Sequence, residues 1–189
     1  MSFRRANKKA APLDEPALYE CAVKALGRRM RTVAELKRLM RCRVEPGESG
    51  EAKIDQIIAR LKAQRYLNDT SYATSYARLR QENQSFGKRR VRQDLVQKGV
   101  HAEVIANTLD AAYGDVNEEE LARKHLERKR VQKPSNEKEA ARVIRMLVRA
   151  GFSTGVIFRI LKKWDVDDEA LTALEFMDND SRESSNGEQ

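Results

Sequence analysis

Hydrophobic residues recur every three or four positions along most of the chain, a spacing typical of amphipathic helices. In the stretch SFGKRRVRQDLVQKGV (85–100), for example, Val91, Leu95 and Val96 fall at helical intervals and should anchor one helix to its neighbours. The pattern predicts helices over residues 16–28, 32–42, 51–65, 69–83, 87–98, 101–113, 117–130, 136–150 and 153–163.

Local signals agree with these boundaries. Thr32 precedes Glu35 by three residues, which is the spacing of a capping box at a helix start. Asp69 is expected to cap the helix that follows it. Gly99 and Gly151 stand where helices must end, since glycine readily adopts the left-handed conformation.

The segment KRRVRQDLVQKGVHAEVIANTLD (88–110) repeats as AARVIRMLVRAGFSTGVIFRILK (140–162), 52 residues later. A fainter third copy begins at residue 32. The sequence therefore predicts an all-α protein, an elongated and curved array of three tandem three-helix repeats. The expected divisions are a basic flexible arm at 1–15, repeats at 16–67, 68–115 and 116–164, and an acidic disordered tail at 165–189.

Composition supports a helical chain, because the 189 residues include only 9 glycines and 4 prolines. The formal charge of +8 is unevenly distributed along the chain. Residues 165–189 hold nine acids and one base, a net charge of −8, so residues 1–164 carry +16. A basic body favours a polyanionic or acidic partner, and the tail could compete for the same basic surface.

The sequence contains no clear pattern of catalytic or metal-binding residues. Cys21 and Cys42 have no second ligand group at metal spacing, and His101 and His125 belong to no catalytic pattern. We therefore expect no enzymatic activity, no cofactor and no metal. The chain has no apolar run long enough to span a membrane and no secretory leader, which predicts a cytoplasmic protein.

Two adjoining motifs resemble those of the RecX regulatory proteins. GKRRVRQDLVQKGV (87–100) is similar to the family signature G-x-x-R-(I/V)-R-x-(E/D)-L-x-x-K-G-(I/V). RYLNDTSYATSYARLR (65–80) resembles the preceding G-Y-L-(D/N)-D-x-x-(Y/F)-A-x-x-(Y/F) segment, with Arg65 where the family usually has glycine. The resemblance covers residues 17–164, and the acidic tail after Trp164 is longer than the family leads one to expect.

The resemblance implies a modulator of the RecA recombinase. Such a protein would bind in the helical groove of the RecA–DNA filament and inhibit its recombinase, ATPase and coprotease activities. It would thereby regulate DNA repair, homologous recombination and the SOS response. The partners expected are the RecA filament and, weakly and without sequence preference, single- and double-stranded DNA; the chain is expected to be a monomer.

Clustered bases are the candidate contacts. Arg142, Arg145 and Arg149 form a stripe on one predicted helix, and the run 123–133 holds six bases and one acid. Guanidinium groups match carboxylate and phosphate geometry, although a solvated face is an equal alternative for any single arginine. The candidates are Arg38, Lys88, Arg89, Arg90, Arg92, Lys124, Arg128, Lys129, Arg130, Arg142, Arg145 and Arg149.

Because apolar residues anchor the helix 87–98, we expect its arginines to be dispensable for the fold and free to meet a partner. The repeat offset places Arg90 on Arg142, so equivalent charges should recur on successive repeats. The aromatic residues could stack on bases, but their helical spacing favours core positions. This applies to Tyr66, Tyr72, Tyr76 and Phe86, whereas Trp164 should close the last repeat.

Two other functions fit the sequence less well. A sequence-specific DNA regulator would use one three-helix unit as a helix-turn-helix, with base-reading side chains and usually a two-fold dimer. Three inequivalent repeats in one chain argue against it. A nuclease or other phosphoryl-transfer enzyme would need a cluster of acids or histidines for metal ions, which the sequence lacks.

Overall fold

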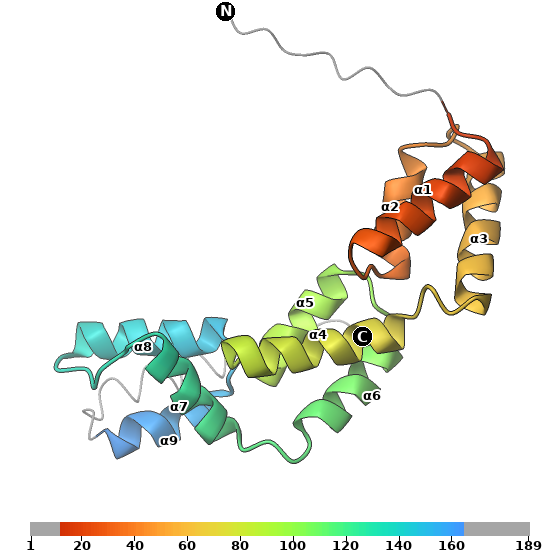
Figure 1. Cartoon of the computed structure of the whole chain (residues 1–189). Helices are drawn as coiled ribbons and strands as arrows, with labels where there is room; N and C mark the ends of the chain where they lie inside the picture. Colours follow the sequence, from red (N-terminus) through yellow and green to blue (C-terminus); the bar gives the residue numbers. More distant parts are fainter. Residues whose placement is uncertain (1–11, 165–189) are drawn as a thin grey trace, which may run out of the picture.

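The computed structural model describes residues 12–164, which form nine α-helices and no strand (Figure 1). The all-α prediction is confirmed, and each predicted helix occurs with boundaries shifted by three residues or fewer. The helices follow one another in three groups along a bent, elongated molecule (Figure 1). Most of the predicted arm and the whole acidic tail lie outside the described residues.

The first group contains α1 (Glu15–Arg28), α2 (Val33–Arg41) and α3 (Glu48–Ala63). Each pair of these helices is in contact. Their shared core is fully buried and is built from residues such as Leu18, Leu36, Met40, Ile54 and Leu61. The backbone N–H of Leu13 also donates to the carbonyl of Arg43, so this group begins before α1.

The second group contains α4 (Asp69–Gln84), α5 (Lys88–Gln97) and α6 (Ala102–Tyr113). The third contains α7 (Glu118–Arg128), α8 (Glu137–Arg149) and α9 (Thr154–Lys163). Residues that the 52-residue offset equates are buried in both groups, which confirms the internal repeat. These pairs are Val91 and Val143, Leu95 and Leu147, Ile105 and Ile157, and Leu109 and Leu161.

The described residues contain two hydrophobic cores for three groups of helices. The first group has its own core, whereas the second and third share one continuous cluster. Phe152 is fully buried in that shared cluster, and Trp164 packs against it at the end of α9, as predicted. The residues at which one repeat gives way to the next stay a prediction.

The middle helices α8, α5 and α2 meet end to end. The backbone N–H groups of Gly87 and Arg89, at the start of α5, donate to the carbonyls of Ala150 and Gly151 at the end of α8, at 2.8 and 3.3 Å. Helix ends normally leave such N–H and C=O groups without a partner inside the helix. Here the N–H groups at the start of α5 pair with the carbonyls at the end of α8. The positive end of one helix dipole also faces the negative end of the next.

The other junction joins α5 to α2 through Thr32. Its hydroxyl donates to the carbonyl of Lys98 (2.6 Å) and accepts from the backbone N–H of Glu35 (3.0 Å). Lys98 Nζ lies 3.2 Å from the Glu35 carboxylate. Thr32 therefore caps α2 as predicted, but Glu35 pairs with the second repeat instead of completing the capping box.

Glycine is required at both junctions. Gly99 and Gly151 have φ angles of +73° and +88°, as their predicted role as helix terminators demands. A Cβ on Gly151 would overlap the backbone of Arg90, and one on Gly99 would overlap the side chain of Ala34. The left-handed turn thus ends a helix and also lets the neighbouring helix approach.

Asp69 does not cap its own helix, which corrects the prediction. Asn68 caps α4 by accepting from the backbone N–H of Ser71. The carboxylate of Asp69 instead accepts from the N–H of Val33 at 2.9 Å, at the start of α2. The second repeat therefore caps a helix of the first.

Arg65 adopts the left-handed conformation, with φ +61°. The family usually has glycine at this turn, and Arg65 keeps the left-handed backbone conformation although it carries a side chain. A non-glycine residue in this conformation costs about 1–2 kcal/mol. Tyr66 beside it is 62% exposed, so its predicted core position is wrong, whereas Tyr72 is buried and Tyr76 and Phe86 pack against the core.

Val96 is 59% exposed, and its equivalent Val148 is 40% exposed. The prediction that Val96 anchors α5 is therefore wrong. Val91 and Leu95 suffice for that contact, because they lie on the buried face of the helix.

His125 links the second and third repeats. It is only 3% exposed, its Nδ1 lies 2.9 Å from the carbonyl oxygen of Gln84, and its ring lies against Phe86 and Phe152. Burial lowers the pKa of His125 below its ordinary value, against the hydrogen bond to Gln84, which raises it.

Replacing Gly151 with alanine should destabilise the protein by about 2–4 kcal/mol. The added Cβ meets Arg90 and forces a strained φ angle. The control is Gly27→Ala in α1, where an added Cβ meets nothing within 4 Å. That change should stabilise by about 0.5–1 kcal/mol. Urea unfolding measures both, and an equal response of the two variants would contradict the stacking role of Gly151.

Acidification from pH 7 to pH 5 should lower the melting temperature through His125. Its folded pKa is lowered, so the unfolded chain binds more protons below the ordinary pKa of 6.5, and stability falls as pH falls through that value. Thermal unfolding by circular dichroism measures the change. The variant His125→Asn retains a donor for Gln84 and should show a weaker pH dependence; an unchanged dependence would contradict this assignment.

Candidate polyanion-binding surface

An open hollow of about 560 Å³ lies where α5 meets α8. The end-to-end packing of these helices brings together bases that lie far apart in the sequence. Arg89, Arg90 and Arg92 line it from α5, and Arg149 lines it from α8. The exposed side chains of Val96 and Val148 also line the hollow.

Arg90 belongs to the junction as well as to the hollow. Its Nε lies 3.2 Å from a carboxylate oxygen of Asp94, and its guanidinium carbon lies 5.8 Å from the centre of the Phe86 ring. Its backbone contacts Gly151. Arg90 is therefore half-buried and has partners within the second repeat, Asp94 and Phe86, whereas its dispensability for the fold stays a prediction.

A second hollow, of about 540 Å³, lies between the end of α7 and the start of α8. Lys129, Arg130, Lys133 and Arg142 line it together with Glu139. The Glu139 carboxylate accepts from the backbone N–H and hydroxyl of Ser135, which lowers its pKa, and Arg142 adds a smaller effect in the same direction.

The arginine stripe of α8 joins the two hollows. Arg142 lines one and Arg149 the other, and Arg145 lies between them on the same exposed face, as predicted. Seven residues of helix rise about 10 Å, so the three charges follow one line across the third repeat. We call this surface the basic ribbon: Arg89, Arg92, Lys129, Arg130, Lys133, Arg142, Arg145 and Arg149.

Four other candidate residues lie away from the ribbon. Lys88 is 2.7 Å from Asp110 of α6, an ion pair that lowers the pKa of that carboxyl. Lys124 and Arg128 line a hollow that also contains Glu82, Glu120 and Glu127, so its charge is mixed. Arg38 is exposed on α2, in the first repeat.

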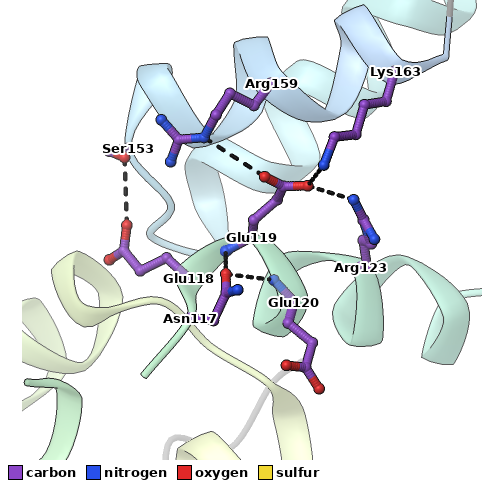
Figure 2. A network of polar contacts seen from close by, with 8 residues as sticks. All are labelled: Asn117, Glu118, Glu119, Glu120, Arg123, Ser153, Arg159 and Lys163. Atoms are coloured by element: carbon purple, nitrogen blue, oxygen red, sulfur yellow. Dashed lines mark hydrogen bonds and ion pairs between the residues drawn. The ribbon is translucent and has the colours of Figure 1, made fainter. Parts of the chain in front are cut away.

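Glu119 forms ion pairs with three bases of the third repeat. Figure 2 shows its carboxylate among Arg123 of α7 and Arg159 and Lys163 of α9. These ion pairs lower the pKa of Glu119, and the hydrogen bond from Lys163 is the largest cause. Asn117, also drawn in Figure 2, caps α7 by accepting from the backbone N–H groups of Glu119 and Glu120.

Sequence reasoning missed two parts of this surface. Lys133 was not among the candidates, although it closes the basic run that contains Lys129 and Arg130. The other part is the exposed pair Val96 and Val148: Val96 is predicted to anchor its helix, because helical spacing alone does not show which edge of an apolar stripe stays uncovered. Their equivalence under the 52-residue offset was the available signal.

The ribbon can bind anions but offers no catalytic arrangement. Its guanidinium groups can form paired hydrogen bonds with phosphates or carboxylates. Among residues 12–164, no group of three or more His, Cys, Asp or Glu side chains could hold a metal ion. None of the helices in this part of the chain is both long and apolar enough to cross a membrane.

Family models match the second and third groups of helices. The model for the second three-helix domain of RecX matches residues 68–109. The model for the third three-helix domain of RecX matches residues 117–161.

Individual proteins extend the similarity over most of the chain. The regulatory protein RecX of Leptothrix cholodnii is 34% identical over 144 residues, which cover 76% of this chain and 87% of that protein. The regulatory protein RecX of Bacillus mycoides is 31% identical over 166 residues, or 85% of this chain and 60% of the longer relative. A crystal structure of a regulatory protein RecX superposes with a TM-score of 0.65 at 25% identity, covering 79% of this chain and 71% of that one.

The ribbon should bind DNA weakly, without sequence preference and with a strong dependence on salt. If five of its bases contact phosphates, the logarithm of the binding constant for duplex DNA falls with the logarithm of salt concentration at a slope of about −4.5. The change Arg145→Gln should reduce that slope by about 1, because one phosphate contact is lost. Fluorescence anisotropy with labelled DNA measures both values.

The matched control for this titration is Lys62→Gln, an exposed base on α3 outside the ribbon. It should leave the slope unchanged. A slope near zero, or a strong preference for one DNA sequence, would contradict a phosphate-binding ribbon.

Proposed function

The chain belongs to the RecX family of regulatory proteins, and we propose that it binds the RecA–DNA filament in its helical groove and inhibits the recombinase. Members of this family regulate and are not enzymes. The finer proposal is that binding lowers strand exchange, ATP hydrolysis and coprotease stimulation by the filament. We further propose that the protein acts in the cytoplasm as a monomer and contacts both the recombinase and its DNA.

The basic ribbon is the observation that best supports this mechanism. Its bases extend from the junction of the second and third repeats to the loop before α8. A filament presents the same acidic groups and phosphates repeatedly along its length. Several weak contacts made at once give high avidity without one strong site.

The shape of the molecule supports the same proposal. The repeats follow one another along a bent, elongated body (Figure 1). Such a body can lie along a groove and cover several filament subunits. Inhibition would then follow from occupancy of the groove, and it would need no chemistry on the part of this chain.

A helix-turn-helix regulator fits the structure less well. Such a protein inserts the N-terminal residues of a recognition helix into the major groove. The start of α5 is covered by the end of α8, and the start of α2 is covered by Thr32, Asp69 and Lys98. The start of α6 offers Ala102, Glu103 and Val104, none of them an Arg, Lys, Asn or Gln that could form a bidentate contact with a base.

The test is the ATPase activity of RecA on single-stranded DNA. Charge reversal at Arg145→Glu and Arg149→Glu should raise the concentration for half-inhibition at least tenfold, a loss of about 1.4 kcal/mol of binding. The fold should survive, because both side chains are exposed and such changes alter stability by about 0.5 kcal/mol. Circular dichroism checks the fold.

The matched control reverses two exposed bases of the first repeat, Lys24→Glu and Lys62→Glu. It changes the net charge equally and should inhibit as the parent does. If the ribbon variant is folded and inhibits equally well, the ribbon is not the docking face. Equal losses in both variants would mean that net charge alone governs inhibition.

A further inference from the structure

The hollow between α5 and α8 combines positive charge with uncovered apolar surface. Val96 and Val148, from equivalent positions of two repeats, are exposed there, at 59% and 40%. Arg89, Arg92 and Arg149 surround them, and Phe152 contributes to the lining. Phosphates alone would leave the valines uncovered, so the surface suits an acidic peptide with apolar side chains.

We propose that the C-terminal segment of this same chain, residues 165–189, occupies the α5–α8 hollow and covers it until a partner displaces the segment. The segment carries a net charge of −8, against the arginines that line the hollow. Its acids flank the apolar sequence LTALEFM (171–177). Leu174 and Phe176 can cover the two valines while neighbouring carboxylates pair with the arginines.

The length of the chain permits this contact. The hollow includes Thr154 at the start of α9, and the segment begins directly after Trp164 at the other end. Ten residues of helix rise about 15 Å. Residues 165–170, when extended, span about 20 Å, so Leu171 and the apolar residues after it can reach the hollow.

Tethering makes even weak contacts sufficient. An exposed ion pair contributes only about 0.2–1 kcal/mol. A short tether, however, gives an effective concentration in the millimolar range. A contact with a dissociation constant of about 1 mM would therefore be occupied for much of the time. The occupied hollow would withhold Arg89, Arg92 and Arg149 from other anions, a form of autoinhibition beyond the proposed function.

Photo-crosslinking in the full-length chain tests this proposal without DNA or recombinase. With p-benzoylphenylalanine in place of Phe176, irradiation should join position 176 to residues of α5 and α8 within one molecule. Mass spectrometry locates the link, and the mass of the product separates links within one chain from links between chains. The same photoreactive residue at Asn186, outside the apolar sequence, should give at least threefold less of this product.

Variants of the hollow sharpen the test. Val96→Ser with Val148→Ser should lower the crosslink yield at least threefold, and Arg89→Gln with Arg149→Gln should do the same. The control is Leu79→Ser, an equally exposed apolar residue on α4 outside the hollow, which should leave the yield unchanged. Circular dichroism confirms that each variant is folded.

Three results would overturn the proposal: crosslinks that map elsewhere, crosslinks mainly between two chains, or a yield unchanged in both hollow variants. The second result would indicate a partner copy as the occupant. None of these results depends on inhibition of RecA, so this inference and the proposed function can fail separately.

Discussion

The architecture depends on the close approach of helix ends at two glycines. Gly99 and Gly151 each end a helix in the left-handed conformation, and each lets the start of the preceding repeat's middle helix pack directly against it. Amide and hydroxyl donors of one helix then satisfy carbonyls of the next. Without that approach the middle helices could not stack, and the repeats would lose the contact that sets their spacing.

This stacking also decides which basic residues pack at a junction between repeats and which are exposed. Arg90 and Arg142 are equivalent in sequence, but only Arg90 has a following repeat to pack against. Glu35, at the same position of the first repeat, pairs with Lys98 across its junction. The third repeat ends the series of described helices, so the corresponding arginine is exposed and lies on the basic ribbon.

Ion pairs within the fold also limit which bases are available to a partner. Glu119 holds Arg123, Arg159 and Lys163 around one carboxylate (Figure 2), and Asp110 holds Lys88. A high density of bases in the sequence is therefore a poor guide to where a partner binds. The stripe on α8 differs, because Arg142, Arg145 and Arg149 are exposed and form no ion pair within the described residues.

The sequence alone determined the helices, their internal repeat, the glycine turns and the α8 stripe, because periodicity, capping and backbone preferences are local properties. The tertiary structure alone decided that Asp69 caps α2, that Arg90 belongs to a junction, and that Val96 and Val148 meet in one uncovered hollow. These outcomes depend on which helix ends meet. Residues 36 and 52 positions apart come into contact or share a surface only after the repeats stack, and no local pattern encodes the direction of that stacking.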